Sequence, residues 1–393
     1  MKTSSWPTDR RLPLLGGMLA AILPLSVAPS LTLKDAYQGQ FYVGVAINRT
    51  IATDTPVKAD NVDRTQAQVD RDIALVKRQF NQISPENDLK WALIQPRPGA
   101  DGYDFAPADA YVDFGLRNHL FIVGHTLVWH NQTPDWVFAG SSPPPPGSQP
   151  ANIYAGPRAT RAELLQRMRD HIFTVVGRYR GKVQVWDVVN EAVANDGPDL
   201  LRQSLWLQII GPDFIARAFQ YAHEADPAAI LRYNDYGLEN APKRRKFIAL
   251  VKSLLAAHVP VMAIGSQTHV SVSAPSFAEE DQALTELEQL GLPIHITELD
   301  VNAAQTGQHR VGADVATNGS ITQGGLVANA SQRLADQYAS LLRAFRRHQR
   351  VKVVTWWGVN DGVSWRAKGS PLLFDGADQA KPAFDAVIAE ARR

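Results

Sequence analysis

The sequence predicts an α/β protein in which eight parallel strands close into one barrel surrounded by helices. Eight short runs rich in β-branched and aromatic residues recur along the chain, and stretches with helical periodicity lie between them. Strands that alternate with helices pair in parallel through crossover connections. No shift in composition marks a second domain, so we expect a single (β/α)8 TIM barrel over residues 31–393.

The predicted strands are short and almost continuously apolar, as expected for strands that are buried on both faces of a parallel sheet. In chain order they are residues 41–47, 80–83, 121–128, 183–189, 230–233, 261–266, 294–296 and 351–357.

Helical periodicity is clearest in five segments, where apolar residues recur every three or four positions. Residues 164–179, for example, carry Leu165, Met168 and Ile172 on one face. The four consecutive prolines within residues 141–150 instead predict a stiff surface loop. The five helical segments are residues 66–76, 164–179, 247–257, 338–345 and 384–391.

The composition fits a globular chain and excludes several classes of function. Of the 393 residues, 45% are hydrophobic and 20% are charged, which suffices for a packed core. Lysine and arginine number 40 against 39 acidic residues, for a net charge of +1, which argues against nucleic acid as a partner. The chain has no cysteine, so disulfides, thiolate catalysis and thiolate-bound metals are excluded.

The first thirty residues have the pattern of a secretory signal peptide. Lys2, Arg10 and Arg11 give a positive start, an apolar stretch follows over residues 12–27, and small residues close it. An uncleaved N-terminal anchor is the alternative, although glycines and a proline interrupt the stretch. We therefore expect an exported protein, secreted or periplasmic, that has no contact with a membrane beyond its export.

Polar and aromatic residues follow every predicted strand except the first. Because active sites of such barrels lie where the strands run into the following loops, these positions are expected to converge at one mouth. In chain order they are Glu86 and Asn87, then His125, Trp129 and His130, then Asn190 and Glu191, Asn234 and Asp235, Gln267 and His269, Glu298 and Asp300, and finally Trp357, Asn360 and Trp365.

Two of these residues, Glu191 and Glu298, follow buried strands on opposite sides of the predicted mouth. Structural carboxylates, each paired with an arginine, are the alternative reading. A facing carboxylate pair suits glycoside hydrolysis, in which one acid protonates the leaving oxygen and the other attacks the sugar or activates water. A separation of about 5–5.5 Å would mean retention of configuration and a wider gap inversion.

The histidines offer a second reading of the same mouth. His125, His130 and His269 would make a plausible zinc set. Metal-dependent barrels usually place ligands after the first strand, and here that strand carries none. Hydrogen bonding to hydroxyl groups and to a catalytic carboxylate is therefore favoured, and no metal or other cofactor is expected.

Tryptophans distinguish a sugar from other small substrates. A pyranose ring has an apolar face that stacks on indole, while its hydroxyl groups bind polar side chains at the edges. Trp91, Trp129, Trp357 and Trp365 all fall at or just past predicted strand ends. Asn87, Lys90, Gln132 and Gln267 are interleaved with them as hydrogen-bonding residues. The predicted site therefore suits a neutral polyol.

With these residues in place, the sequence resembles the family 10 glycoside hydrolases, endo-β-1,4-xylanases with a (β/α)8 barrel. The resemblance extends from residues 33–36 to residues 381–384, nearly the whole mature chain. Asp88 and Leu89 are mild departures from the family pattern, whereas Thr268 and Val270, where many members have glycine and an aromatic residue, depart from it on the aglycone side. The matching segments are residues 86–91 (ENDLKW), 124–130 (GHTLVWH), 186–192 (WDVVNEA), 233–236 (YNDY), 267–269 (QTH), 296–300 (ITELD) and 357–358 (WG).

The resemblance implies a role for each candidate residue. Glu191 would be the acid/base and Glu298 the nucleophile, with retention of configuration. Asn190, Asn234, His269 and Asp300 would support them, His269 by pairing with Glu298. The substrate-binding residues would be Glu86, Asn87, Lys90, His125, Trp129, His130, Gln132, Gln267, Trp357 and Trp365.

The sequence thus predicts an exported, monomeric, cofactor-free endo-1,4-β-xylanase acting on xylan or xylo-oligosaccharides. Lys90 and the pair His125 and His130 favour xylose, because a sugar with a hydroxymethyl group would need extra room there. A retaining glycosidase acting on β-glucan or short oligosaccharides is the alternative within enzymes. A non-catalytic sugar-binding barrel is the alternative from another class.

Overall fold

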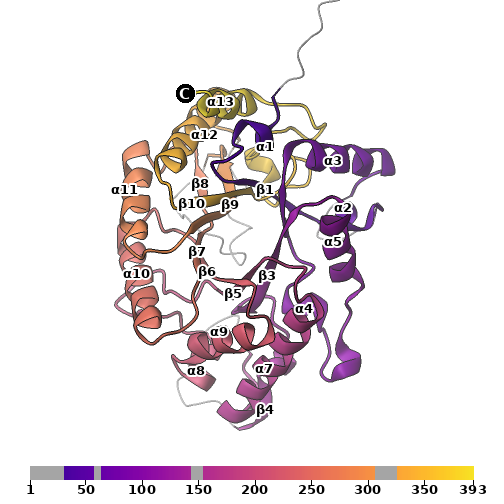
Figure 1. The fold of residues 1–393 in the computed structure, drawn as a ribbon, viewed down its shortest axis with the longest axis vertical. Helices are drawn as coiled ribbons and strands as arrows, with labels where there is room; N and C mark the ends of the chain where they lie inside the picture. Colours follow the sequence, from indigo (N-terminus) through magenta and orange to yellow (C-terminus); the bar gives the residue numbers. More distant parts are fainter. Residues whose placement is uncertain (1–30, 57–62, 143–153, 306–324) are drawn as a thin grey trace, which may run out of the picture. The chain divides into compact units, whose positions relative to one another are not determined.

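Eight parallel strands form a closed ring in the computed structural model, with helices around it (Figure 1). The strands follow one another in the order β1, β2, β3, β5, β6, β7, β9 and β10, and β10 pairs with both β9 and β1 to close the ring. The structure describes residues 31–56, 63–142, 154–305 and 325–393. The predicted signal peptide and the four prolines of the predicted loop lie outside the described residues, whereas residues 141 and 142 of that loop end a short strand.

All eight predicted strands are confirmed, with small shifts at their ends. Phe80 ends the preceding helix instead of starting β2, and β9 extends six residues beyond its predicted end. The barrel strands are β1 (Tyr42–Ile47), β2 (Gln82–Pro85), β3 (Phe121–Trp129), β5 (Val185–Asn190), β6 (Ile230–Asp235), β7 (Ala263–Ser266), β9 (Ile294–Asn302) and β10 (Val351–Trp356). Two short strands add to them, β4 (Ala139–Ser142) and β8 (His269–Ser271), the latter pairing with the end of β9.

The five predicted helices are also present, each longer than its apolar pattern. They are α3 (Gln66–Gln79), α7 (Arg161–Arg178), α10 (Ala241–Ala256), α12 (Ala330–Arg347) and α13 (Pro382–Ala391). Three further long helices were not singled out from the sequence: α5 (Ala106–Arg117), α9 (Phe214–Ala225) and α11 (Phe277–Glu288). Shorter helices are α1 (Leu33–Ala36), α2 (Arg49–Thr53), α4 (Trp91–Ile94), α6 (Asp135–Phe138), α8 (Leu205–Ile210) and the 3₁₀ turns η1 (Ala100–Gly102) and η3 (Ala367–Gly369).

The inside of the barrel is polar as well as apolar. Gly44 on β1 leaves room for the side chain of Gln82, because a Cβ atom there would lie 1.4 Å from Gln82 Oε1. That oxygen accepts a hydrogen bond from Thr355 Oγ1 at 2.6 Å. Between β5 and β6, the buried carboxylate of Asp187 accepts two hydrogen bonds from Arg232. These contacts join β2 to β10 across β1, and β5 to its neighbour β6.

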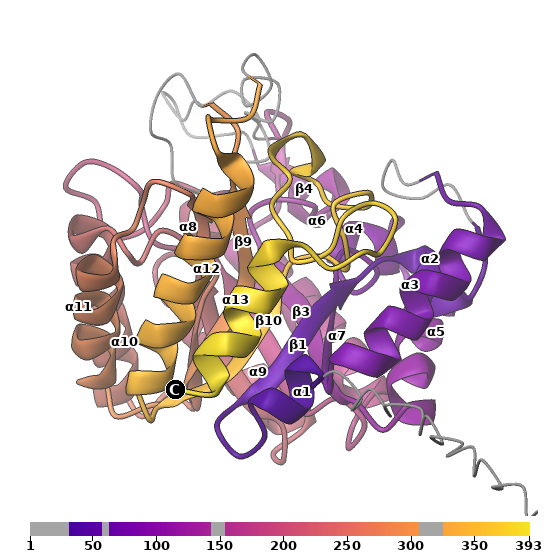
Figure 2. The same ribbon diagram turned by 90° about the horizontal axis from the view of Figure 1, so that it is seen from above.

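The long loops that follow the strands gather at one end of the barrel. Figure 2 shows the segment between β10 and α13 in yellow at the upper end, together with α4, α6 and β4. α1 lies at the opposite end, near the start of β1. Among the residues that the structure describes, no helix has the length and apolar character needed to span a membrane.

Candidate active site

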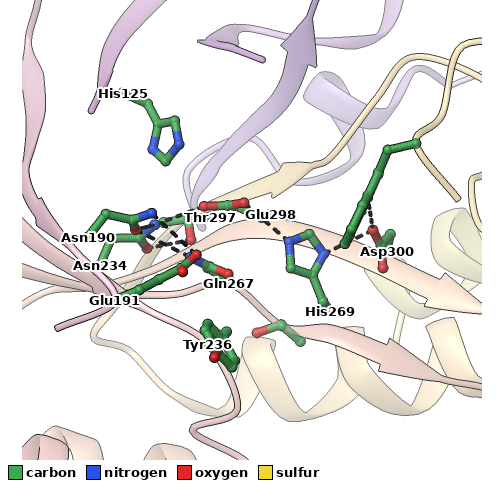
Figure 3. Close-up of polar contacts among 12 residues, drawn as sticks. His125, Asn190, Glu191, Asn234, Tyr236, Gln267, His269, Thr297, Glu298 and Asp300 are labelled. Carbon is green, nitrogen blue, oxygen red and sulfur yellow. Dashed lines mark hydrogen bonds and ion pairs between the residues drawn. The ribbon is translucent and has the colours of Figure 1, made fainter. Parts of the chain in front are cut away.

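Side chains from β5, β6, β7 and β9 meet at the carboxyl ends of these strands (Figure 3). Asn190 and Asn234 are the last and next-to-last residues of β5 and β6, and Gln267 directly follows β7. Glu298 lies within β9. Residues 190, 234 and 267 are 3% exposed or less, so this group is a buried polar cluster at the floor of the mouth.

Glu191 directly follows β5 and is only 3% exposed. Its backbone adopts φ +58°, a left-handed conformation that turns the chain at the strand end. Trp129 Nε1 donates to Oε2 of Glu191 at 2.9 Å, and Gln267 Nε2 donates to Oε1 at 2.9 Å. Both carboxylate oxygens are therefore held in place by side chains from other strands.

The environment of Glu191 favours its protonated form. Burial raises the pKa of this carboxyl above its usual value, because a charged form is poorly solvated there. The hydrogen bond from Gln267 opposes that rise, while the negative charge of Asp235 adds to it. The cation of Arg202 lowers the pKa and the charge of Glu298 raises it. The net effect is the one that a general acid requires.

Glu298 has the opposite environment although it is equally buried. Burial alone would raise its pKa, but the hydrogen bond with His269 and the nearby His125 together hold the pKa below its usual value. Oε1 accepts a hydrogen bond from Asn234 Nδ2 at 2.9 Å, and Oε2 lies 3.2 Å from His269 Nε2. Glu298 is thus kept ionised, as a nucleophile requires.

Two asparagines link the carboxylates. Nδ2 of Asn234 donates to Glu298 and to Oδ1 of Asn190 at 3.0 Å. Nδ2 of Asn190 lies 3.3 Å from Oε1 of Glu191. Thr297 fixes the orientation of Asn234 by donating to its Oδ1 at 2.7 Å. The amide groups therefore set the position of both acids relative to one another.

His125 enters the cluster from β3. Its Nδ1 lies 3.0 Å from Oδ2 of Asp187, and its ring meets Trp357 edge-on with centroids 5.4 Å apart. Figure 3 shows the imidazole directed toward Asn190 and Glu298. Asp187 is itself bound by Arg232, so the contact with Asp187 orients the imidazole of His125.

A second polar group lies beside Trp129. Lys90 Nζ donates to Oδ1 of Asn87 at 2.9 Å and lies 5.0 Å from the centre of the Trp129 ring. Gln132 Nε2 donates to the same oxygen at 3.2 Å. Glu86, half-buried, directly follows β2 at the same end of the barrel. The structure therefore brings residues 87, 90 and 132 together and joins them to Glu191 through Trp129.

The four tryptophans lie in different environments, and one of them, Trp91, is not at the mouth as expected. Trp357 and Trp365 are partly exposed at the mouth, and Trp365 contacts the ring of His269 at 5.1 Å. Trp129 is 6% exposed and donates a hydrogen bond to Glu191. Trp91, however, is 2% exposed and stacks on His171 at 3.7 Å, so it belongs to the core and not to the rim.

The histidines do not form a metal set. His125 pairs with Asp187 and His269 with Glu298, while His130 contacts Trp129 edge-on at 5.7 Å. Over the described part of the chain, no three His, Cys, Asp or Glu side chains are grouped so that they could hold a metal ion. Burial and nearby cations lower the pKa of His130 well below its usual value, so it is neutral.

Several residues of the site were not identified as such from the sequence. Arg202 Nε donates to the carbonyl oxygen of Glu191 at 3.1 Å, and its Nη2 donates to the hydroxyl of Tyr236 at 2.7 Å. Tyr236 lies within a motif already noted, so its proximity to Asn234 could have indicated it. Arg202 lies in a loop without periodicity, and no sequence signal places it beside Glu191.

The chain matches proteins that carry the same kind of site. The family model "Glycosyl hydrolase family 10" matches residues 32–390. An endo-1,4-beta-xylanase of Geobacillus stearothermophilus is 37% identical over 365 residues, covering 91% of this chain and 98% of that protein. Endo-1,4-beta-xylanase A of Caldicellulosiruptor sp. (strain Rt8B.4) is 38% identical over 363 residues and 91% of this chain, which spans only 47% of that longer protein.

A solved structure supports the same grouping. The structure of a GH10 endoxylanase retrieved from a sugarcane soil metagenome superimposes with a TM-score of 0.77 at 33% sequence identity. The match covers 92% of this chain and 99% of that one. The similarity therefore extends over the barrel and is not confined to the motifs at its mouth.

Proposed function

The chain belongs to glycosyl hydrolase family 10, and we propose that it is an endo-1,4-β-xylanase that works with Glu191 as acid/base and Glu298 as nucleophile. The observation that carries the assignment of roles is the opposite environment of these two buried carboxyl groups. Burial raises the pKa of Glu191, whereas the hydrogen bond with His269 and the charge of the nearby His125 outweigh burial and lower the pKa of Glu298. One acid and one anion at the same mouth are what a double displacement requires.

In the first step, Glu298 attacks the anomeric carbon while Glu191 gives its proton to the glycosidic oxygen. The carbon–oxygen bond to the leaving sugar breaks as the ester bond to Glu298 forms. Asn190 donates toward the same region and is placed to bind the 2-hydroxyl group of the sugar under attack. His269 and Asn234, which contact Glu298, hold its attacking carboxylate in position.

In the second step, Glu191 acts as a base. Formation of the ester removes the negative charge of Glu298, and that charge is one of the causes that raise the pKa of Glu191. The pKa of Glu191 therefore falls in the intermediate, so that it accepts a proton from water. The water oxygen attacks the anomeric carbon, the ester bond breaks, and Glu298 is released as a carboxylate. Two inversions at one carbon give net retention.

Xylan is the substrate that the rest of the mouth favours. Trp357 and Trp365 are partly exposed tryptophans on which sugar rings can stack, and Lys90 and His125 at the same mouth are buried. Asn87, Lys90 and Gln132 form one hydrogen-bonded group that supplies donors and acceptors to hydroxyl groups. A neutral polymer of xylose meets all of these features.

Product analysis on linear xylan and on β-glucan tests this function. The proposal predicts short xylo-oligosaccharides of several lengths early in the xylan digest and a far slower reaction on β-glucan. Products from β-glucan alone would replace the substrate assignment. Oligosaccharide binding without turnover of either polymer would instead support a non-catalytic sugar-binding barrel.

The enzyme is proposed to act as a monomer outside the cytoplasm after export by residues 1–30. Support comes from the charged start, apolar middle and small-residue end of that segment. N-terminal sequencing of the protein recovered from the periplasm and culture fluid checks the cleavage, and light scattering checks the mass. Protein retained in the membrane fraction with its N-terminus intact would indicate an anchor.

A further inference from the structure

Asp300 lies behind the proposed nucleophile and accepts three hydrogen bonds. His269 Nδ1 lies 2.9 Å and Trp365 Nε1 2.8 Å from Oδ2, while Arg366 Nη1 lies 2.8 Å from Oδ1. The side chain of Asp300 is fully buried, and Arg366 is only 8% exposed. Two of the three donors come from the segment that follows β10, so this segment and β9 meet at one carboxylate.

These contacts form a row of four alternating charges. Arg366 pairs with Asp300, Asp300 with His269, and His269 with Glu298. Burial opposes charge on His269, but Asp300 and Glu298 raise its pKa to about 9, so it is a cation at neutral pH. In this row His269 stands between two carboxylates, and Arg366 shares the outer one with it, while the charge of Arg366 opposes protonation of His269. Two further titratable groups act on the row: Glu239 on His269, and His125 on Glu298.

We propose that Arg366 is a positioning residue for the nucleophile: by pairing with Asp300 it leaves the positive charge of His269 available to Glu298. Without Arg366, one imidazolium would face two buried carboxylates, and the group would carry a net negative charge. Glu298 would then be less stable as an anion and less able to attack. This inference rests on the proposed role of Glu298.

The backbone after β10 is built to hold Arg366 in this place. Gly369 lies so close to β9 that a Cβ atom there would lie 2.0 Å from Oδ1 of Asn302. Its amide donates to the carbonyl of Arg366 at 2.7 Å, and its carbonyl accepts from the amide of Ala303 at 2.9 Å. The short turn η3 is therefore docked on β9, two residues past Asp300. Trp365 and Arg366 directly precede this turn. The segment that brings Trp365 to the mouth therefore also places the charge of Arg366 next to Asp300.

Covalent labelling reports on Glu298 without involving Glu191. We would label the full chain with 2,4-dinitrophenyl 2-deoxy-2-fluoro-β-xylobioside, because dinitrophenolate leaves without a proton and the fluorine slows hydrolysis of the ester. The labelling rate is followed against pH, and peptide mass mapping locates the ester. In the wild-type chain the acidic limb of the profile reports the ionisation of Glu298.

Arg366→Met should move that acidic limb upward by roughly half a pH unit or more. Arg366→Lys, which keeps the charge, should bring it back toward the wild-type position. Lys368→Met, which removes an exposed cation from the same turn, should leave it unchanged. Arg366→Gln keeps a donor to Asp300 without the charge and serves if Arg366→Met does not fold.

An acidic limb that stays at the wild-type position in Arg366→Met or Arg366→Gln would overturn the inference, even if the rate fell at every pH. That result would mean a structural role only. Failure of the proposed function looks different, since the wild-type chain would then take no label on Glu298. The two failures are therefore distinguished in one set of samples.

Discussion

At the scale of single residues, Glu191 and Glu298 have the same side chain, and it is their surroundings that give them different proton affinities. Both are about equally buried, at 3% and 5% exposure. Their position at the mouth follows from the strand pattern in the sequence. Their difference in proton affinity does not, because it depends on His269, His125 and Gln267, which approach from other strands. Only the resemblance to a family indicated which glutamate does what.

Replacing each glutamate should separate the two steps. Glu298→Ala should lower kcat on xylan by about 10⁴-fold or more while leaving oligosaccharide binding intact, because no covalent intermediate can form. Glu191→Ala should still form the ester from substrates with good leaving groups but release it slowly. Steady-state and burst kinetics with aryl xylosides measure both effects. Glu224→Ala, an exposed residue of α9, is the control, and normal turnover by Glu298→Ala would contradict the assignment.

The hydrogen bond from Gln267 should be visible in the pH profile. Its Nε2 donates to Oε1 of Glu191 and lowers the pKa of that carboxyl, so Gln267→Met should raise it. The basic limb of kcat/KM, where the acid loses its proton, should therefore move to higher pH. A shift to lower pH, or no shift in a folded variant, would show that Gln267 does not control the proton of Glu191.

At the scale of elements, the sequence predicted the barrel strands better than the helices. A buried parallel strand is a compact apolar run, and all eight were found that way. α5, α9 and α11 were not singled out, although each buries large apolar residues, such as Tyr111 on α5, Phe219 on α9 and Leu284 on α11. Their apolar residues recur with helical spacing as those of the predicted helices do, so these three helices could have been predicted from the same pattern.

The position of Trp91 was also predicted wrongly, since its place in the sequence resembles that of a tryptophan at the mouth. It is the first residue of α4 and packs between His171 and Trp206 in the core. Trp91→Ala should therefore lower the free energy of unfolding by about 3–5 kcal/mol, measured by denaturant titration. Trp357→Ala should leave stability nearly unchanged and lower kcat/KM on the order of tenfold. A stable Trp91→Ala variant with lowered kcat/KM would instead mean that Trp91 binds substrate.

At the scale of the whole molecule, closure of the ring explains why motifs far apart in sequence act together. Residues at the ends of β3, β5, β6, β7 and β9 converge because β10 pairs with both β9 and β1. The strand pattern therefore indicated most of the cluster. Arg202, Arg232 and Arg366 were missed, because none of them lies in a motif segment that matches the family. Asp187 lies in such a segment, residues 186–192, but its role depends on Arg232 and His125, which approach from other strands.

The stability of the protein should depend on Glu280, a buried acid whose burial is opposed by the charge of Arg244 but not offset by it. Burial raises the pKa of Glu280 on α11 well above its usual value, and the charge of Glu239 raises it further. A raised folded-state pKa contributes stability at low pH that is lost as pH rises through it. Glu280→Gln should therefore become more stable than the wild type between pH 4 and pH 8, by more than about 1 kcal/mol at the upper end.

Glu286 on the same helix is the matched control with the opposite sign. A hydrogen bond from Arg244 lowers its pKa to about 2, so its contribution to stability is present at neutral pH and is lost in acid. Glu286→Gln should therefore be less stable than the wild type at pH 7 and approach it near pH 2. Denaturant titrations across pH measure both variants, and equal pH dependence in the two would contradict the electrostatic account.

The most direct test of the central claim is the anomeric form of the first product, followed by proton NMR during hydrolysis of linear xylan. The account predicts that β-anomer appears first and that α-anomer follows only by mutarotation, because Glu298 forms a covalent intermediate that water then opens. Appearance of α-anomer first would mean a single displacement with inversion. It would contradict the roles of Glu191 and Glu298 together.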